Sequence, residues 1–595
     1  MKKVISGIFV ILAASFTLSS CEDYLKENNR NAMTTVYYNT PEGVQAAIHA
    51  GYYLNRTFYY QETPIQMLET GTDLFYKGND NKQSAVAGYG SDLNGSTGTS
   101  GTTLGIWETT WQLWYRGIEW ANIALENLEI VPMDAALKKR LTGEANFLRA
   151  WYNWHIVETW GPVILKTKPT NMSDPEVLSP KKTPIKDFYT QILADLDVAI
   201  ANLDGYDPKD GHANIWGAKA FKARVLLYMA SEYNAEACGY TADQAKSFAT
   251  QAATLAAEVI ASSGRKLYPI YRDTWDMKNA NARNNTESIW YVNYTSNLSF
   301  TGSSLTSMVP SSGNGGNEAL VTYTIKYDDQ AGLTRTVRYG RPFNRVMVSM
   351  RALKLFDNTI DQRFNVTFLN LWCVNDAGKL ATARAGNYPK MGDIGDTAML
   401  MINGLATAGQ KAWAAGRYQI LDYTNIYGGA MEPENVKTYS ALRGFQMNKF
   451  ADSTRSGGQD DLRSIRDASV LRLAEMYLIA SEAYWRAGDN TNALKYMNEL
   501  RTTRAVPGKT AEMTVATGDL TLDFFLDENA REFIGEIHRW SDLKRTKKLV
   551  EYNQKYNPDG KANIKEHHLL RPIPQGQLDA VLNKDEFKQN PGYDK

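Results

Sequence analysis

Cysteine is scarce in this sequence, and its scarcity excludes two common structural devices. The three cysteines are Cys21, Cys238 and Cys373. They form no CxxC pattern of the kind that binds zinc, and they are too few for a disulfide framework in a chain of 595 residues. We expect Cys238 and Cys373 to be small apolar core residues rather than functional thiols.

An excess of charge of either sign is also absent. Lysine and arginine together number 65, and so do aspartate and glutamate, so the formal net charge is zero. No basic run or basic amphipathic stretch offsets this balance. A protein that binds nucleic acid needs a basic surface that displaces counterions from phosphates. The composition therefore argues against a nucleic-acid partner.

Signature motifs of catalysis and of metal binding are missing as well. The sequence has no GxSxG, no HExxH and no glycine loop followed by Lys-Ser/Thr. Only six histidines occur, and the adjacent pair His567 and His568 lacks the spacing of a helical metal site. We therefore expect no cofactor and assign no metal site, and we expect a binding protein rather than an enzyme.

One charge-rich helix, at residues 527–545, offers an alternative to that view. Glu528, Glu532 and Glu536 recur every four residues, and a pair of carboxylates could act as general acid and base in a glycosidase. Side chains four apart lie on one helix face, whereas glycosidase carboxylates flank the scissile bond from opposite sides. Ion pairs with nearby arginines are the simpler interpretation, and the candidates are Arg531, Arg539 and Arg545.

The amino-terminal segment is typical of a secretory signal peptide. Lys2 and Lys3 precede a largely apolar run, residues 4–18, that is too short to span a bilayer comfortably. The letters LSSC, which end at Cys21, resemble the lipobox of bacterial lipoproteins, whose cysteine is lipidated and becomes the first residue. No later apolar run approaches the length of a membrane helix. We expect a lipid anchor on Cys21; the alternative is an ordinary signal peptide with an incidental cysteine.

Apolar periodicity predicts helices in both the first and the last part of the chain. From residue 107 to 128 apolar residues recur at alternating spacings of four and three, so Trp107, Trp111 and Trp114 are core candidates first. Two helices joined by a Gly-Asp turn follow residue 468, and their small residues fit a tetratricopeptide-type hairpin, although no clean tandem array is present. Further helices are predicted at residues 41–57, 143–158, 186–203, 214–232 and 242–262.

Residues 265–467 show a different pattern. Short β-like pieces such as ESIWYVNY alternate with Gly- and Asn-rich stretches such as SSGNGGNEA, and aromatic residues are scattered among them. The pattern predicts irregular structure with small hairpins. Because the chain has 14 tryptophans and 34 tyrosines, we also expect an aromatic-lined recognition surface. A separate loop at 78–104 is rich in Gly, Ser, Thr and Asn, and loops of that length are usually functional or disordered.

Six segments spanning nearly the whole chain carry a family resemblance. They are CEDYL from Cys21, LTGEANFLRAWYNWHIVETWGPVIL (141–165), WGAKAFKARVLLYMA (216–230), LRLAEMYLIASEAYWRAGD (471–489), ENAREFIGEIHRWSDLKRTKKL (528–549), and LRPIPQGQLD with QNPGY (570–593). In this order they resemble the SusD/RagB family of nutrient-binding outer-membrane lipoproteins of Bacteroidetes. Pro162 lies earlier than the usual proline of the family, which is a small departure.

The resemblance implies a fold, a function and a partner. The fold would be mostly α-helical, a tetratricopeptide-like hairpin scaffold with an irregular, loop-rich ligand-binding region that contains small β-hairpins. Family members capture oligo- or polysaccharides at the cell surface and deliver them to a SusC-like TonB-dependent β-barrel in the outer membrane. Glu22 and Asp23 resemble the acidic tract of surface-exported lipoproteins. The resemblance implies no catalysis; a peptide or other nutrient as ligand, and more distantly a glycoside hydrolase, are the alternatives.

These expectations divide the chain and supply a candidate site. The predicted parts are a signal peptide (1–20), an N-terminal helical region (21–264), a loop-rich ligand-binding region (265–467) and a C-terminal helical region (468–595). Aromatic rings would cover the C–H faces of a sugar, and polar side chains would bond its hydroxyls. The candidate rings are Tyr76, Tyr89, Trp275, Tyr323, Tyr327 and Tyr339, with Asn79 and Arg338 as polar partners.

Overall fold

The computed structural model describes residues 35–98, 105–295, 297, 316–455 and 457–593. Cys21 and the predicted signal peptide lie outside the described residues, as does part of the loop predicted at 78–104. No described helix combines the length and the apolarity that crossing a membrane requires.

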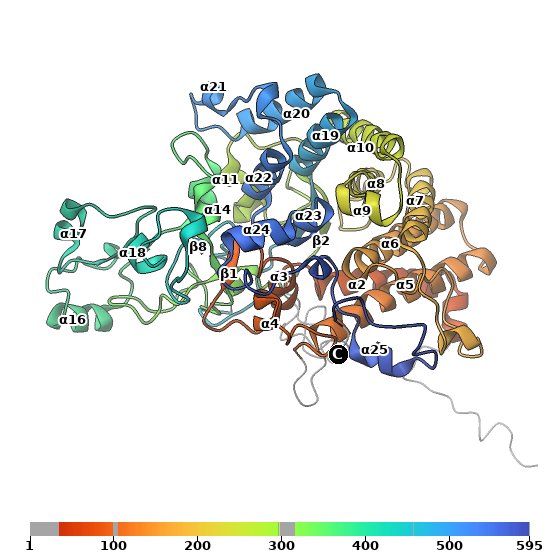
Figure 1. Ribbon diagram of the computed structural model, residues 1–595, viewed down its shortest axis with the longest axis horizontal. Coiled ribbons are helices and arrows are strands. Elements are labelled where there is room, and N and C mark those ends of the chain that lie inside the picture. Colours follow the sequence, from red (N-terminus) through yellow and green to blue (C-terminus); the bar gives the residue numbers. More distant parts are fainter. Residues whose placement is uncertain (1–34, 99–104, 296, 298–315, 456, 594–595) are drawn as a thin grey trace, which may run out of the picture.

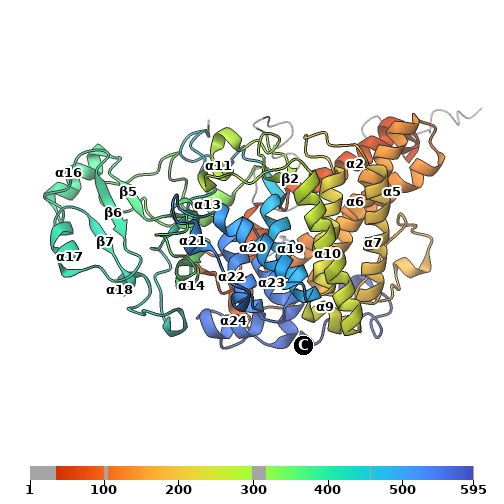
Figure 2. The same cartoon turned by 90° about the horizontal axis from the view of Figure 1, so that it is seen from above.

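Eight of the described helices pack side by side in the order in which they follow one another along the chain (Figure 2). Each contacts the next, so the layer consists of stacked helical pairs, and the predicted tetratricopeptide-like scaffold is confirmed. Helices α10 and α19 are neighbours in the layer although the loop-rich region separates them in the sequence. The eight are α2 (Pro41–Arg56), α5 (Ile106–Ile130), α6 (Ala135–Trp160), α7 (Ile185–Asn202), α8 (Ile215–Met229), α10 (Ala242–Ser262), α19 (Leu473–Ala487) and α20 (Asn490–Thr503).

Local sequence sets the ends of these helices. At the start of α10 the side chains and backbone N–H groups of Thr241 and Gln244 bond reciprocally in a capping box. Helix α19 ends at Gly488, whose φ of +89° is a left-handed conformation that glycine adopts without a Cβ clash. The predicted tryptophan stripe of α5 is confirmed as core, since Trp107, Trp111 and Trp114 are all buried.

Shorter helices fill the rest of the described chain. Several lie within the loop-rich region at 265–467, and others follow α20. They are α3 (Glu62–Leu68), α4 (Ser84–Gly88), α9 (Glu232–Ala237), α11 (Tyr271–Trp275), α13 (Ala319–Tyr323), α14 (Met350–Lys354), α15 (Arg363–Thr367), α16 (Ala377–Ala385), α17 (Ala408–Ala414), α18 (Tyr423–Ile426), α21 (Thr510–Met513), α22 (Leu522–Phe533), α23 (Arg539–Arg545), α24 (Leu549–Tyr556) and α25 (Gln575–Ala580).

The described strands are short and mostly join segments that are distant in the sequence. Three two-stranded antiparallel sheets pair β1 with β3, β2 with β9, and β4 with β8, and in the second of these Trp290 lies opposite Leu471. The small strands thus tie the loop-rich region to both helical parts instead of closing tight hairpins within it. The strands are β1 (Phe75–Lys77), β2 (Ser288–Val292), β3 (Val346–Val348), β4 (Phe368–Leu369), β8 (Gln446–Met447) and β9 (Ala468–Arg472).

A small lobe projects from one end of the molecule (Figures 1 and 2). Its sheet joins β5 (Leu371–Cys373) to β6 (Thr397–Met401) antiparallel, and β6 to β7 (Gln419–Leu421) parallel. Helices α16, α17 and α18 surround this sheet. Cys373 of the lobe is half-buried and Cys238 is buried, and both are free thiols.

Candidate functional site

The structure places five of the six predicted sugar-binding rings inside the protein. Tyr76, Tyr89, Tyr323, Tyr327 and Tyr339 are each at most 3% exposed, so their rings present no open face to a ligand. This corrects the expectation that they form the binding surface.

The remaining predicted residues lie nearer to solvent. Trp275 is half-buried, while Asn79 and Arg338 are exposed.

Packing explains why these tyrosines point inward. The ring of Tyr323 stacks on Phe450 at 5.6 Å between centroids, and its hydroxyl donates to the carbonyl of Gly535 at 3.0 Å. Tyr327 and Tyr339 meet edge to face at 5.4 Å. A region with little regular structure has few apolar helix faces to bury, so large rings provide its core. The loops of this region are therefore held in place by the residues that were expected to bind the ligand.

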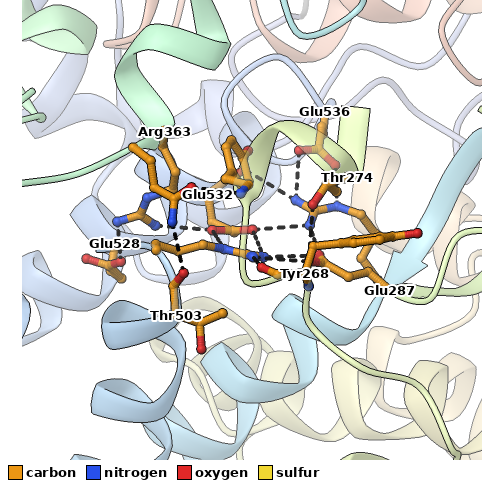
Figure 3. Close-up of polar contacts among 12 residues, drawn as sticks. Tyr268, Thr274, Glu287, Arg363, Thr503, Glu528, Glu532 and Glu536 are labelled. Atoms are coloured by element: carbon orange, nitrogen blue, oxygen red, sulfur yellow. Dashed lines mark hydrogen bonds and ion pairs between the residues drawn. The ribbon is translucent and has the colours of Figure 1, made fainter. Parts of the chain in front are cut away.

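The glutamates of the charge-rich segment lie in a buried network of ion pairs (Figure 3). Glu532 on α22 accepts hydrogen bonds from Arg504 at 2.9 Å and from Arg472 and Arg363 at 3.1 Å each. Glu536 pairs with Arg472 at 2.9 Å and with Lys449 at 2.7 Å.

The network also includes Glu528 of α22 and Glu287, the residue before β2. Arg363 bonds Glu528 at 2.8 Å, and Glu287 pairs with Arg504 at 3.0 Å. Arg531, one of the arginines named from the sequence, does pair with Glu528, whereas Arg539 and Arg545 pair elsewhere.

This network prevents Glu528 and Glu532 from acting as a catalytic pair. Burial alone would raise the pKa of Glu532, but the charges of Arg504, Arg472 and Arg363 outweigh it and hold the pKa below its usual range. The arginines around Glu528 lower its pKa in the same way. Both side chains are fully buried, so neither can reach a substrate, and neither carries a proton that it could donate. The predicted single helix at 527–545 is divided between α22, which ends at Phe533, and α23, which begins at Arg539. The ion-pair interpretation of this segment is supported over a glycosidase site.

A neighbouring carboxyl behaves in the opposite way and gives a pH-dependent prediction. Burial raises the pKa of Glu69 to about 8, although the backbone N–H of Ile537 donates to its Oε1 at 2.6 Å. Its Oε2 has no partner among the described residues. The pKa of a glutamate in the unfolded chain is about 4.3. Between about pH 4.3 and pH 8 the Glu69 carboxyl is therefore protonated in the folded state and ionised in the unfolded state. The stability that this proton provides is complete below about pH 4.3 and is lost as the pH rises towards 8.

We therefore expect Glu69→Gln to change the pH dependence of stability. The variant should match the wild type near pH 4 and gain on it by about 1.4 kcal/mol per pH unit above pH 5, or about 2 kcal/mol between pH 6 and pH 7.5. Guanidinium unfolding of both proteins at each pH measures the difference, in which the contributions of all other titrating groups cancel. Parallel stability profiles for the two proteins would contradict the assignment.

A cavity of about 390 Å³ opens between α2, the loop at 210–212 and the end of β2. Half-buried Tyr53 and Arg56 come from α2, and Tyr291 and Asn293 come from β2 and the residue after it. None of these residues was singled out in the sequence. One signal was available: Tyr52 and Tyr53 are adjacent aromatic residues near the end of a predicted helix, and both line the cavity.

The walls of the cavity are held by hydrogen bonds and ring contacts. The imidazole of His212 stacks on Tyr52 at 4.8 Å, and its Nδ1 lies 3.2 Å from the buried carboxylate of Glu144. Burial opposes the charging of His212, but the hydrogen bond and charge of Glu144 raise its pKa on balance. The indole N–H of Trp290 donates to the carbonyl of Gly211 at 3.0 Å, which fixes the loop against β2. These contacts hold the walls of the cavity in place.

Two family models match the chain, and together they cover most of it. A model described as "SusD family" matches residues 273–593, more than half of the chain. A model described as "Starch-binding associating with outer membrane" matches residues 23–227. The first covers α22 and α23 with their charge network, and the second covers α2, α5 and α6 of the helical layer.

Curated relatives and solved structures agree with these models. "SusD-like protein P25" of Formosa agariphila is 24% identical over 99% of both chains. A solved "Laminarin binding SusD-like protein" is similar with a TM-score of 0.64 and 22% identity, over 93% of this chain and 99% of the other. "Surface glycan-binding protein A from Bacteroides thetaiotaomicron in complex with laminarihexaose" is similar with a TM-score of 0.62 and 18% identity, over the same shares.

Proposed function

Because the chain belongs to the SusD family, we propose that it is a surface lipoprotein that captures a glycan and delivers it to a SusC-like TonB-dependent transporter in the outer membrane. The lipid on Cys21 would keep the protein at the membrane in which this barrel lies. The observation that carries the proposal is full-length similarity to two proteins whose names record laminarin and laminarihexaose as ligands. The description of the second family model, "Starch-binding associating with outer membrane", supports a location at the outer membrane.

Within the predicted residue set, the exposed members are the proposed ligand contacts. Asn79 and Arg338 offer an amide and a guanidinium to sugar hydroxyls, and Trp275 is the one predicted ring that keeps part of its surface open. The backbone N–H of Asn79 donates to the carbonyl of Ala441 at 3.0 Å, so the residue has a fixed position before a ligand arrives. A fixed contact lowers the entropic cost of binding.

Calorimetry with a panel of neutral polysaccharides tests this function. We expect the purified chain to bind at least one of laminarin, starch, xylan and galactomannan, and we expect Asn79→Ala with Arg338→Ala to weaken that binding at least fivefold. A double variant with exposed residues on other parts of the molecule, Asn490→Ala with Arg384→Ala, should bind as the wild type does. Failure of every polysaccharide to bind, combined with binding of a peptide pool, would favour a peptide as the nutrient instead.

A further inference from the structure

The projecting lobe carries the most exposed tryptophan of the chain. All 14 tryptophans lie among the described residues, and Trp413 of α17 is the one that is exposed, at 62%. The others are buried or half-buried. The ring of Trp413 therefore adds little to the core of the lobe, and a large apolar surface stays open to a ligand.

An arginine holds this exposed ring in place. The guanidinium carbon of Arg417 lies 4.1 Å from the centroid of the Trp413 ring, and Nη1 of Arg417 donates to the carbonyl of Trp413 at 2.8 Å. The stacking and the hydrogen bond together fix the ring relative to the backbone. Because Arg417 covers one face of the indole, the exposed surface of Trp413 lies on the opposite face and the edges. A ring held in position before a ligand arrives lowers the entropic cost of binding.

Hydrogen-bond donors that reach solvent flank the ring. Gln410 lies three residues before Trp413 on α17, a spacing that places two side chains on the same side of a helix. Oε1 of Gln410 accepts from the backbone N–H of Thr407 at 2.8 Å, which fixes the amide, and its Nε2 makes no hydrogen bond within the described chain. Nε and Nη2 of Arg417 are likewise unused among the described residues. Gln410 is exposed and Arg417 is half-buried, so these donors are accessible to a ligand.

An open ring beside free N–H donors is suited to a sugar. A pyranose has a C–H face that packs on an aromatic ring, and its hydroxyl groups accept hydrogen bonds at the edge. The other cation of α17, Lys411, pairs with Asp422 at 2.8 Å, so its charge is balanced locally. Protein interfaces bury a wider apolar core, whereas the neighbours of Trp413 along α17 are Gln410, Lys411 and two alanines. The surroundings of the ring therefore favour a glycan over a protein partner.

We propose that Trp413, Gln410 and Arg417 form a second sugar contact, which binds one pyranose of a polysaccharide that is also held at Asn79 and Arg338. Helix α17 lies at the outer end of the lobe, whereas β1, which ends two residues before Asn79, lies in the body of the molecule (Figures 1 and 2). One long glycan would engage both places, and two linked contacts bind a polymer more tightly than either contact alone. This inference rests on the proposed function and adds a site to it.

Calorimetric titration of laminarin, starch, xylan and galactomannan tests the proposal with a variant and a matched control. Trp413→Ala should weaken the polysaccharide that binds about fivefold, as loss of one ring contact would, and its Tm should stay at the wild-type value because the ring is exposed. Ile394→Ala removes another exposed apolar side chain, 57% exposed, from the same lobe and should bind within about twofold of the wild type. Unchanged affinity in Trp413→Ala overturns the proposal.

Iodide quenching of tryptophan fluorescence shows whether the sugar covers the ring. Iodide reaches exposed indoles, so Trp413→Ala should lower the quenching of the free protein. A saturating concentration of the bound polysaccharide should protect the wild type from iodide more than it protects Trp413→Ala. Equal protection of the two proteins overturns the proposal.

The outcomes separate the lobe contact from the proposed function. Polysaccharide binding that weakens with Asn79→Ala and Arg338→Ala, but not with Trp413→Ala, leaves the proposed function standing and removes the lobe from it. Binding of no polysaccharide removes both, because the second contact rests on the proposed function. If size-exclusion chromatography shows a dimer that Trp413→Ala converts to a monomer, the ring is an interface between two copies of the chain, and the sugar contact is overturned.

Discussion

Glu532→Gln is expected to destabilise the protein by roughly 3–5 kcal/mol, the usual cost of removing one partner from a buried ion pair. Glu532 is fully buried and accepts hydrogen bonds from Arg363, Arg472 and Arg504. Glutamine removes the negative charge and also turns an N–H₂ group towards guanidinium donors. Fewer negative charges would then balance the three buried arginines, and water cannot reach them to compensate, so the folded state loses stability.

The midpoint of guanidinium unfolding measures this loss, and the matched control is Glu512→Gln. Glu512 pairs with Lys509 at 2.9 Å, but both side chains are 45% exposed, so water can replace the partner and the midpoint should not move. Trp275, one of the proposed ligand contacts, lies against this network, with Lys449 4.6 Å and Arg472 5.4 Å from its ring, so the unfolding midpoint and not glycan affinity is the readout for Glu532→Gln. An unchanged midpoint for Glu532→Gln would contradict the structural role of the network.

The helical layer could be predicted because its signal is local. Seven-residue spacing of apolar side chains identifies a helix without knowledge of its partners, and the pattern from residue 107 to 128 gave α5 (Ile106–Ile130) almost completely. Helix α6 was predicted at 143–158 and extends over Ala135–Trp160, because Asp134 caps its start and Gly161, with φ of +69°, ends it. Ends depend on single capping residues, so they are less certain than the helix itself.

The charge network could be predicted only in part because its partners come from distant segments. The periodic glutamates of residues 527–545 indicate that carboxylates share a helix face, and they suggest nearby arginines as partners. The structure brings Arg363 from 169 residues away and Arg504 from 28 residues away to the same carboxylate. A single sequence does not state which distant arginine will meet which glutamate.

The candidate site was the least predictable feature, for a physical reason. Tyrosine serves equally well as a core residue in irregular structure and as a surface for sugar rings, and composition does not distinguish the two uses. Burial separates them here: Tyr323 and Tyr327 support the loops, whereas Tyr53 lines a cavity. The cavity forms where α2, the loop at 210–212 and β2 pack together. The sequence of any one of these segments does not reveal that tertiary contact.

Cys21→Ala is expected to release the protein from membranes almost completely. A bacterial lipoprotein cysteine carries a diacylglyceryl group and an N-acyl chain, and each buried methylene contributes about 0.8 kcal/mol to membrane binding. One chain alone holds a protein only marginally, whereas several chains together anchor it stably. No described helix could replace this anchor by crossing the membrane. Fractionation of cells followed by immunoblotting of membrane and soluble fractions measures the effect.

Cys373→Ala is the matched control, because it removes a half-buried free thiol of the projecting lobe and should leave the protein with the membranes. Purified Cys21→Ala protein should bind its polysaccharide as tightly as the wild type, since the anchor contributes nothing to the sugar contacts. Cells that produce only this variant should nevertheless lose growth on that polysaccharide, because a captured glycan no longer reaches a barrel in the membrane. Membrane retention of Cys21→Ala at the wild-type level would rule out the anchor, and normal growth of cells with fully released protein would rule out delivery from the membrane surface.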